Sequence, residues 1–151
     1  MTLLHEMGET QRIPATAIKK MVEAISNYPL KTFPIQQKEM PEGLDPYRHV
    51  SCHCALGNIY QMLATRGVNV DQELPWIRPW FLRYQMADGG LSCDNEAYLV
   101  KEECPSSMVG TIPPFEAVLL HTPRPFSADE TAFLNRGAKF LMDRKLMRGS
   151  A

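Results

Sequence analysis

Apolar residues recur along this chain at the spacing of three and four that is typical of amphipathic helices. In the first such segment Ile18, Val22 and Ile25 share one face, and Lys19 and Glu23 lie on the other side. Three further segments repeat this spacing, and a serine cap at 106 or 107 begins another helix that ends near residue 121. No alternating strand pattern extends over more than a few residues. The pattern therefore predicts an all-α protein with five helices, at residues 13–25, 50–65, 75–86, 106–121 and 127–148.

Capping and turn residues mark where these helices begin and end. Ser127 and Glu130 form a capping box, in which each side chain satisfies a backbone N–H at the start of the last helix. The Asp-Gly-Gly run at 88–90 predicts a turn after the third helix. Gly137 lies inside the last helix at a cost of about 1 kcal/mol relative to alanine, so we expect another helix to approach closely there.

Composition and charge narrow the function classes. The chain has 151 residues, 44% of them hydrophobic and 22% charged, which predicts one globular domain over residues 1–151. Its 16 basic and 17 acidic side chains give a net charge of -1, so no basic excess is available to bind nucleic acid. No apolar stretch approaches the roughly 20 residues that span a membrane. The N-terminus lacks the pattern of a signal peptide, so we expect a cytoplasmic protein with reduced thiols.

Two patterns in the second half of the chain resemble a known repeat. Phe-x-x-x-Gln at 81–85 followed by Gly-Gly-Leu at 89–91 resembles the QW repeat of squalene cyclases, and Arg-Gly-x-x-Phe at 136–140 is similar to its front half. The segments 88–93 and 106–111 are similar to the connection from an outer to an inner helix in that superfamily. Its members include terpenoid cyclases and protein prenyltransferase β subunits. The resemblance implies a toroid of paired α-helices.

The resemblance covers residues 71–148 and concerns the fold rather than the activity. Leu91 stands where the repeat usually has tryptophan, Arg144 stands where the second copy would have glutamine, and the acidic motifs of the cyclases and related synthases are missing. Five helices make less than half of a toroid of six hairpins. We therefore expect a partner protein, a second copy in a homodimer, or a further part of the chain to cover the open edge.

Potential metal ligands cluster near the start of the predicted second helix. His49, Cys52 and His53 are three and four residues apart, which places them on one helical face where they can converge on one ion. Cys54 is expected to point away from that face. Thiolate and imidazole ligands in a mixed set favour zinc.

The resemblance brings further ligands to the same place. In a toroid the inner helices begin at one rim, and the glycine turns arrive there too. If the second and fourth helices are inner ones, this rim also holds Cys93, Asp94 and Cys104. Protein prenyltransferases hold zinc on such a rim, although their ligand spacing differs from the spacing in this chain. The predicted zinc ligands are His49, Cys52, His53, Cys93 and Cys104.

The same residues also have structural interpretations. Cys52 on an apolar helix face is a small core residue, and His53 can bond a neighbouring carbonyl. Asp88 and Asp94 are the candidate catalytic residues, because a carboxylate can assist a metal-bound water. Asp88 can instead stabilise the glycine turn, and Asp94 can belong to a solvated loop.

Three functions remain open from the sequence. The leading hypothesis is a zinc-binding domain of the toroid superfamily, for which cysteine-rich ligation favours a structural over a catalytic site. The first alternative is an interaction or assembly module whose open edge packs on a partner or on itself. The second is a fragment of an isoprenoid-handling transferase or cyclase, which would bind a small apolar or isoprenoid ligand.

Overall fold

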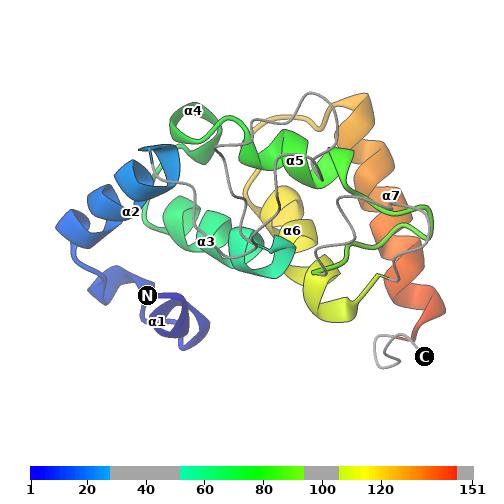
Figure 1. Ribbon diagram of the computed structural model, residues 1–151, viewed down its shortest axis with the longest axis horizontal. Helices are drawn as coiled ribbons and strands as arrows, with labels where there is room; N and C mark the ends of the chain where they lie inside the picture. The colour runs from blue at the N-terminus through cyan, green and yellow to red at the C-terminus, as the bar shows by residue number, and fades with distance from the viewer. Residues whose placement is uncertain (28–51, 94–105, 146–151) are drawn as a thin grey trace, which may run out of the picture.

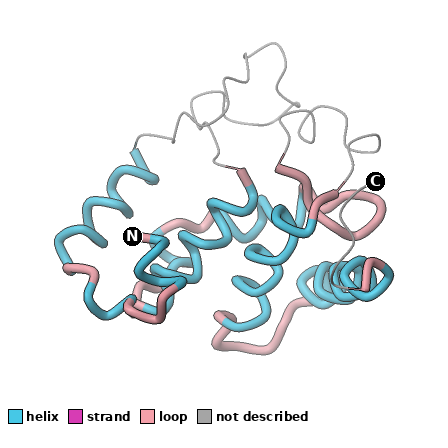
Figure 2. Tube along the Cα trace, turned by 90° about the horizontal axis from the view of Figure 1, so that it is seen from below, coloured by secondary structure: helices cyan, strands magenta, loops and turns pink. Residues whose placement is uncertain are grey.

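The structure, a computed structural model, describes residues 1–27, 52–93 and 106–145 (Figures 1 and 2). Regular secondary structure in these residues is helical, and the all-α prediction is confirmed. Leu91 and Ser107 form an isolated antiparallel bridge. Within the described ranges, no helix is both long and apolar enough to span a membrane. The helices are α1 (Thr2–Glu6), the 3-10 helix η1 (Thr10–Arg12), α2 (Ala15–Asn27), α3 (His53–Thr65), α4 (Val70–Glu73), α5 (Ile77–Arg83), α6 (Met108–Leu120) and α7 (Ala128–Asp143).

The five helices that the sequence predicts correspond to α2, α3, α5, α6 and α7. Ser107 caps α6 through its side chain, and the helix continues through Pro113 and Pro114. The short helices α1, η1 and α4 are missing from the prediction, because a single turn is too short to show a repeating apolar pattern. In α4 the side chain of Asn69 supplies the cap.

Helices α3 and α6 lie side by side near the middle of the molecule (Figure 1). Gly57 makes this close packing possible, because a Cβ atom there would lie 2.4 Å from both the carbonyl carbon of Pro113 and the nitrogen of Pro114. One turn further along α3, the Gln61 amide donates a hydrogen bond to the Pro113 carbonyl (3.1 Å). The two helices therefore touch through their backbones.

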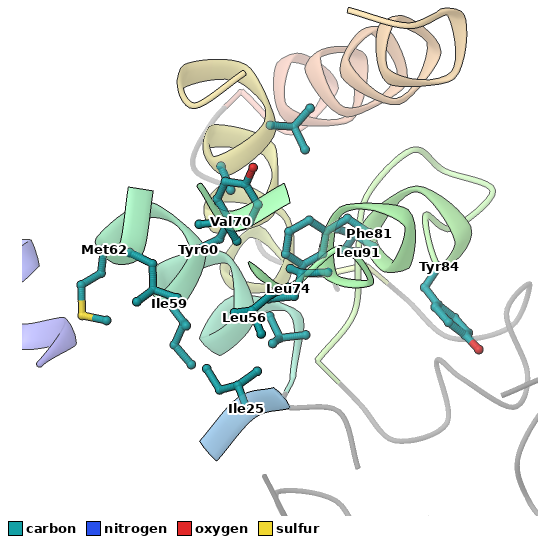
Figure 3. Packing of buried hydrophobic residues seen from close by; sticks show 14 of the residues in the cluster. Ile25, Leu56, Ile59, Tyr60, Met62, Val70, Leu74, Phe81, Tyr84 and Leu91 are labelled. Atoms are coloured by element: carbon teal, nitrogen blue, oxygen red, sulfur yellow. The ribbon is translucent and has the colours of Figure 1, made fainter. Parts of the chain in front are cut away.

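The hydrophobic core is built from this pair of helices together with residues of α2, α4, α5 and α7 (Figure 3). Burying an aliphatic or aromatic side chain of this size contributes about 1.5–3 kcal/mol. The core residues with an exposed fraction of 2% or less include Ile13, Leu56, Met62, Leu63, Val70, Leu74, Ile77, Phe81, Leu91 and Phe133.

A buried arginine on α5 connects the helices around the core. The Arg78 side chain is 7% exposed, and its Nε donates to the Asp71 carboxylate at 2.9 Å. One terminal nitrogen donates to the Tyr60 hydroxyl at 2.5 Å. The other donates to Glu130 at 3.1 Å and to the Thr122 hydroxyl at 2.5 Å. One guanidinium thus binds α3, α4, α7 and the segment before α7.

Glu130 is the buried carboxylate that compensates this charge. Its side chain is 2% exposed and accepts two hydrogen bonds from Arg124, at 2.8 and 2.9 Å. It also accepts from the backbone N–H of Ser127, while its own N–H donates to the Ser127 hydroxyl, so the predicted capping box is confirmed.

The residues of the QW-like pattern join the end of α5 to α7. The buried Gln85 side chain donates to the carbonyls of Gly89 and Phe133, each at 2.8 Å, and accepts from Nε of Arg136 at 2.8 Å. A Cβ atom on Gly137 would lie 2.8 Å from the ring of Phe115 in α6, which confirms the expected close approach. These contacts fix the turn at 86–90 against α7.

Replacing Gly57 with alanine is expected to lower the free energy of unfolding by about 1–3 kcal/mol. The added Cβ meets backbone atoms of α6, which cannot turn aside. Gly137→Ala is the matched control, since its Cβ meets an aromatic ring that can rotate, and its loss should be smaller. Urea unfolding measures both, and equal losses would contradict the backbone contact between α3 and α6.

Replacing Glu130 with alanine is expected to cost about 3–5 kcal/mol, because the charge of Arg78 then stays buried without this partner. Asp143→Ala, which removes only an exposed pair with Lys139, should cost less than about 1 kcal/mol. Denaturant unfolding at neutral pH compares the two. A similar loss of unfolding free energy in both variants would show that the buried pair contributes no more to stability than the exposed pair.

Glu130 also predicts a pH dependence of stability. Hydrogen bonds from Arg124 lower the pKa of its carboxyl group to about 2, below the value of about 4.3 for an exposed glutamate. A carboxyl with a lowered pKa stabilises the fold above its unfolded pKa, and this contribution is lost as the pH falls through the folded value. The stability difference between wild type and Glu130→Gln should therefore be constant near neutral pH and shrink between about pH 4 and about pH 2. A difference that does not change with pH would refute the assignment.

Candidate metal centre

Three cysteines come together where α3 begins. The Sγ atoms of Cys52, Cys54 and Cys93 all lie within 4.8 Å of one another, and those of Cys52 and Cys54 are 3.1 Å apart. The three thiols are free and partly buried. A tetrahedral zinc ion with Zn–S bonds of about 2.3 Å holds its sulfur atoms about 3.8 Å apart. The sulfur atoms are therefore spaced so that they could hold one metal ion.

The start of α3 explains how Cys52 and Cys54 meet. Cys52 is the N-cap residue, with φ -54° and ψ 153°, and α3 itself begins at His53. The sequence prediction begins this helix at residue 50 and applies helical spacing to Cys52. Because Cys52 precedes the helix, that spacing does not hold, and the expectation that Cys54 points away is wrong. A prediction that begins the helix at residue 53 would leave Cys52 outside the helical spacing. Cys54 would then remain a candidate ligand beside it.

The turn at 86–90 leads the chain to Cys93. The N–H of Met86 donates to the Gly90 carbonyl at 2.8 Å, which closes the turn. The Leu91 N–H then donates to the hydroxyl of Thr111 (2.8 Å), and the Leu91 carbonyl accepts from the N–H of Ser107 (3.0 Å). Hydrogen bonds to the first turn of α6 thus fix the backbone two residues before Cys93.

His53 lies between the first two cysteines and is fully buried. Its Nδ1 lies 2.5 Å from the carbonyl oxygen of Ser92. A carbonyl only accepts, so Nδ1 carries the proton. The ring packs near the rings of Phe81 and Tyr84, with centroid separations of 6.4 and 6.3 Å. Burial lowers the pKa of His53 to about 4, so the imidazole is neutral at neutral pH.

The thiols interact strongly with one another. Hydrogen bonds from Cys54 and Cys93 lower the pKa of Cys52, and the backbone N–H of Ala55 in the first turn of α3 lowers it further. The same hydrogen bonds raise the pKa values of Cys54 and Cys93. A helix N-terminus stabilises a thiolate. The three thiols therefore share their protons closely, and a cation in the cluster would favour the thiolate form of all three.

The sequence-predicted ligands are only partly brought together. Cys52 and Cys93 lie in the sulfur cluster, whereas His53 is not part of it. Instead, the imidazole makes the carbonyl contact that the structural interpretation expects. Its role as a ligand stays a prediction. His49 and Cys104 lie outside the described residues, so their roles also stay predictions.

Asp88 holds the glycine turn. One of its carboxylate oxygens accepts from the N–H of Gly90 at 3.1 Å and from the hydroxyl of Ser106 at 2.6 Å. The other lies 3.6 Å from the guanidinium of Arg144. These contacts stabilise the glycine turn, as the structural interpretation of Asp88 expects. Asp88 is not part of the sulfur cluster. Asp94, the second candidate catalytic residue, lies outside the described residues.

Comparison with known proteins finds no relative of this chain. No family model, curated protein or solved structure matches the chain. The chemistry of the sulfur cluster must therefore be inferred from its own residues and geometry.

Proposed function

We propose that this chain is a zinc-binding helical protein whose metal is held by the thiolates of Cys52, Cys54 and Cys93. The single observation that carries the proposal is the convergence of three sulfur atoms within 4.8 Å. Two of them belong to the start of α3 and the third follows a turn about 40 residues later in the chain. Zinc would fasten these two segments to each other.

The chemistry of the donors favours zinc. Thiolates select soft or borderline ions, among which zinc accepts three or four cysteines in a tetrahedral site. Cysteine-rich zinc sites are mostly structural, because they leave no position open for water or substrate. We therefore assign the site a structural role, in which metal binding contributes directly to folding.

A closed zinc site needs a fourth ligand. Of the other ligands that the sequence predicts, His53 bonds the Ser92 carbonyl, and His49 and Cys104 lie outside the described residues. His49 would complete a site of three cysteines and one histidine, and Cys104 would complete a site of four cysteines. Both types are common in structural zinc sites. A water molecule in the fourth position would instead make the site catalytic, which is the alternative that the sequence leaves open.

The resemblance to squalene cyclases and prenyltransferases remains part of this proposal. In that arrangement α3 and α6 are inner helices, and α5 and α7 are outer ones. The direct packing of α3 on α6 supports it, and so do the Gln85 contacts that join the end of α5 to α7.

The second candidate function is an interaction or assembly module that packs on a partner or on a second copy of the chain. The observation that favours it is a set of large apolar side chains left in solvent on α6 and α7. Val109, Leu120 and Met142 are 68%, 65% and 73% exposed.

Elemental analysis of the protein, purified without a histidine tag, tests the zinc site. About one zinc ion per chain is expected in the wild type, with loss of zinc in Cys52→Ser, Cys54→Ser and Cys93→Ser, because each change removes one thiolate. Asp88→Asn is the matched control from the turn that precedes Cys93, and it should keep its zinc.

The fourth ligand is identified by the same measurement on His49→Ala and Cys104→Ser, of which one should lose zinc. A wild-type protein without metal would overturn the proposal, and so would zinc that survives all three substitutions in the sulfur cluster. A metal-free dimer in sedimentation would favour the assembly module instead.

A further inference from the structure

One buried hydrogen bond joins the two segments that carry the sulfur atoms. His53 stands between Cys52 and Cys54, and its Nδ1–H donates to the carbonyl of Ser92, the residue before Cys93. The donor and the acceptor are thus each one residue away from a sulfur ligand. The two residues are 39 positions apart in the chain, so this contact joins segments that are distant in the sequence.

The ring of His53 has little freedom to leave this position. It is fully buried, and the rings of Phe81 and Tyr84 lie next to it. His53 is also the first residue of α3, directly after the N-cap. Its backbone position is therefore fixed by the helix and its ring by the core, so the bond holds the Ser92 carbonyl in one place.

We propose that His53 is a positioning residue of the zinc site, which holds Cys93 opposite Cys52 and Cys54 without binding the metal itself. The inference rests on the proposed zinc site. With the segments already joined, the three sulfur atoms are close together before the ion arrives, so less chain entropy is lost on binding. Groups that orient metal ligands in this way typically change metal affinity by 10-fold to 100-fold.

Two polar replacements of His53 test the bond while keeping a hydrogen-bonding side chain. In asparagine the amide nitrogen occupies the position of Nδ1, whereas in glutamine it lies one bond further out. Zinc affinity is measured by competition with a chromophoric chelator. His53→Asn should stay within about 5-fold of the wild type, and His53→Gln should bind about 10-fold to 100-fold more weakly.

Gln61→Leu is the matched control, because it also removes a buried hydrogen bond from an α3 side chain to a backbone carbonyl, that of Pro113. It should destabilise the protein without changing zinc affinity. This separates positioning of the ligands from a general loss of stability.

Cobalt substitution distinguishes positioning from direct ligation. If His53 only positions Cys93, the cobalt spectra of wild type and His53→Asn should agree in sulfur-to-metal charge transfer and in the d–d bands. A d–d spectrum that changes in His53→Asn would show that the imidazole is itself a ligand, and would overturn the inference.

The outcomes separate the two proposals. A wild-type protein without zinc refutes the proposed function. A wild-type protein that binds zinc with the same affinity as both His53→Asn and His53→Gln keeps the zinc site and refutes the positioning role.

Discussion

The arrangement of the helices depends on the hydrogen bonds that the buried guanidinium of Arg78 makes. This group is buried and permanently charged, so the fold has to supply compensating groups around it. Tyr60, Asp71, Thr122 and Glu130 supply them from α3, α4, the segment before α7 and α7. Burial of apolar surface does not depend on direction, whereas each of these hydrogen bonds does. The network therefore fixes where α5 stands relative to its neighbours.

Hydrogen bonds link the position of α5 to the position of the sulfur cluster. Gln85, just beyond the end of α5, binds the turn at 86–90 to α7. The backbone of Leu91 donates to Thr111 and accepts from Ser107, which binds the next stretch to the start of α6. On the other side, Gly57 lets α3 pack against the backbone of α6. The starting point of α3 and the segment of Cys93 are thus held against the same helix. A zinc ion at this place would connect two segments that the core has already brought close.

The sequence predicts the local features of this structure better than the long-range ones. Five helices and the Ser127 capping box follow from spacing and end signals, which act within one or two turns. The Arg78 network does not, because its partners are up to 52 residues away and nothing in a local pattern relates them. The sequence places Cys54 on the wrong face for a local reason, because the helix starts a few residues later than predicted and Cys52 therefore lies outside the helical spacing. The meeting of Cys52 with Cys93 follows in the sequence analysis only from the toroid resemblance.

The central claim is that thiolates of this cluster hold zinc, and X-ray absorption at the zinc edge of the wild-type protein tests it most directly. The account predicts at least three sulfur neighbours at about 2.3 Å from the metal. A zinc ion surrounded mainly by nitrogen and oxygen at about 2.0–2.1 Å would contradict it, because the cluster of Cys52, Cys54 and Cys93 would then not be the site.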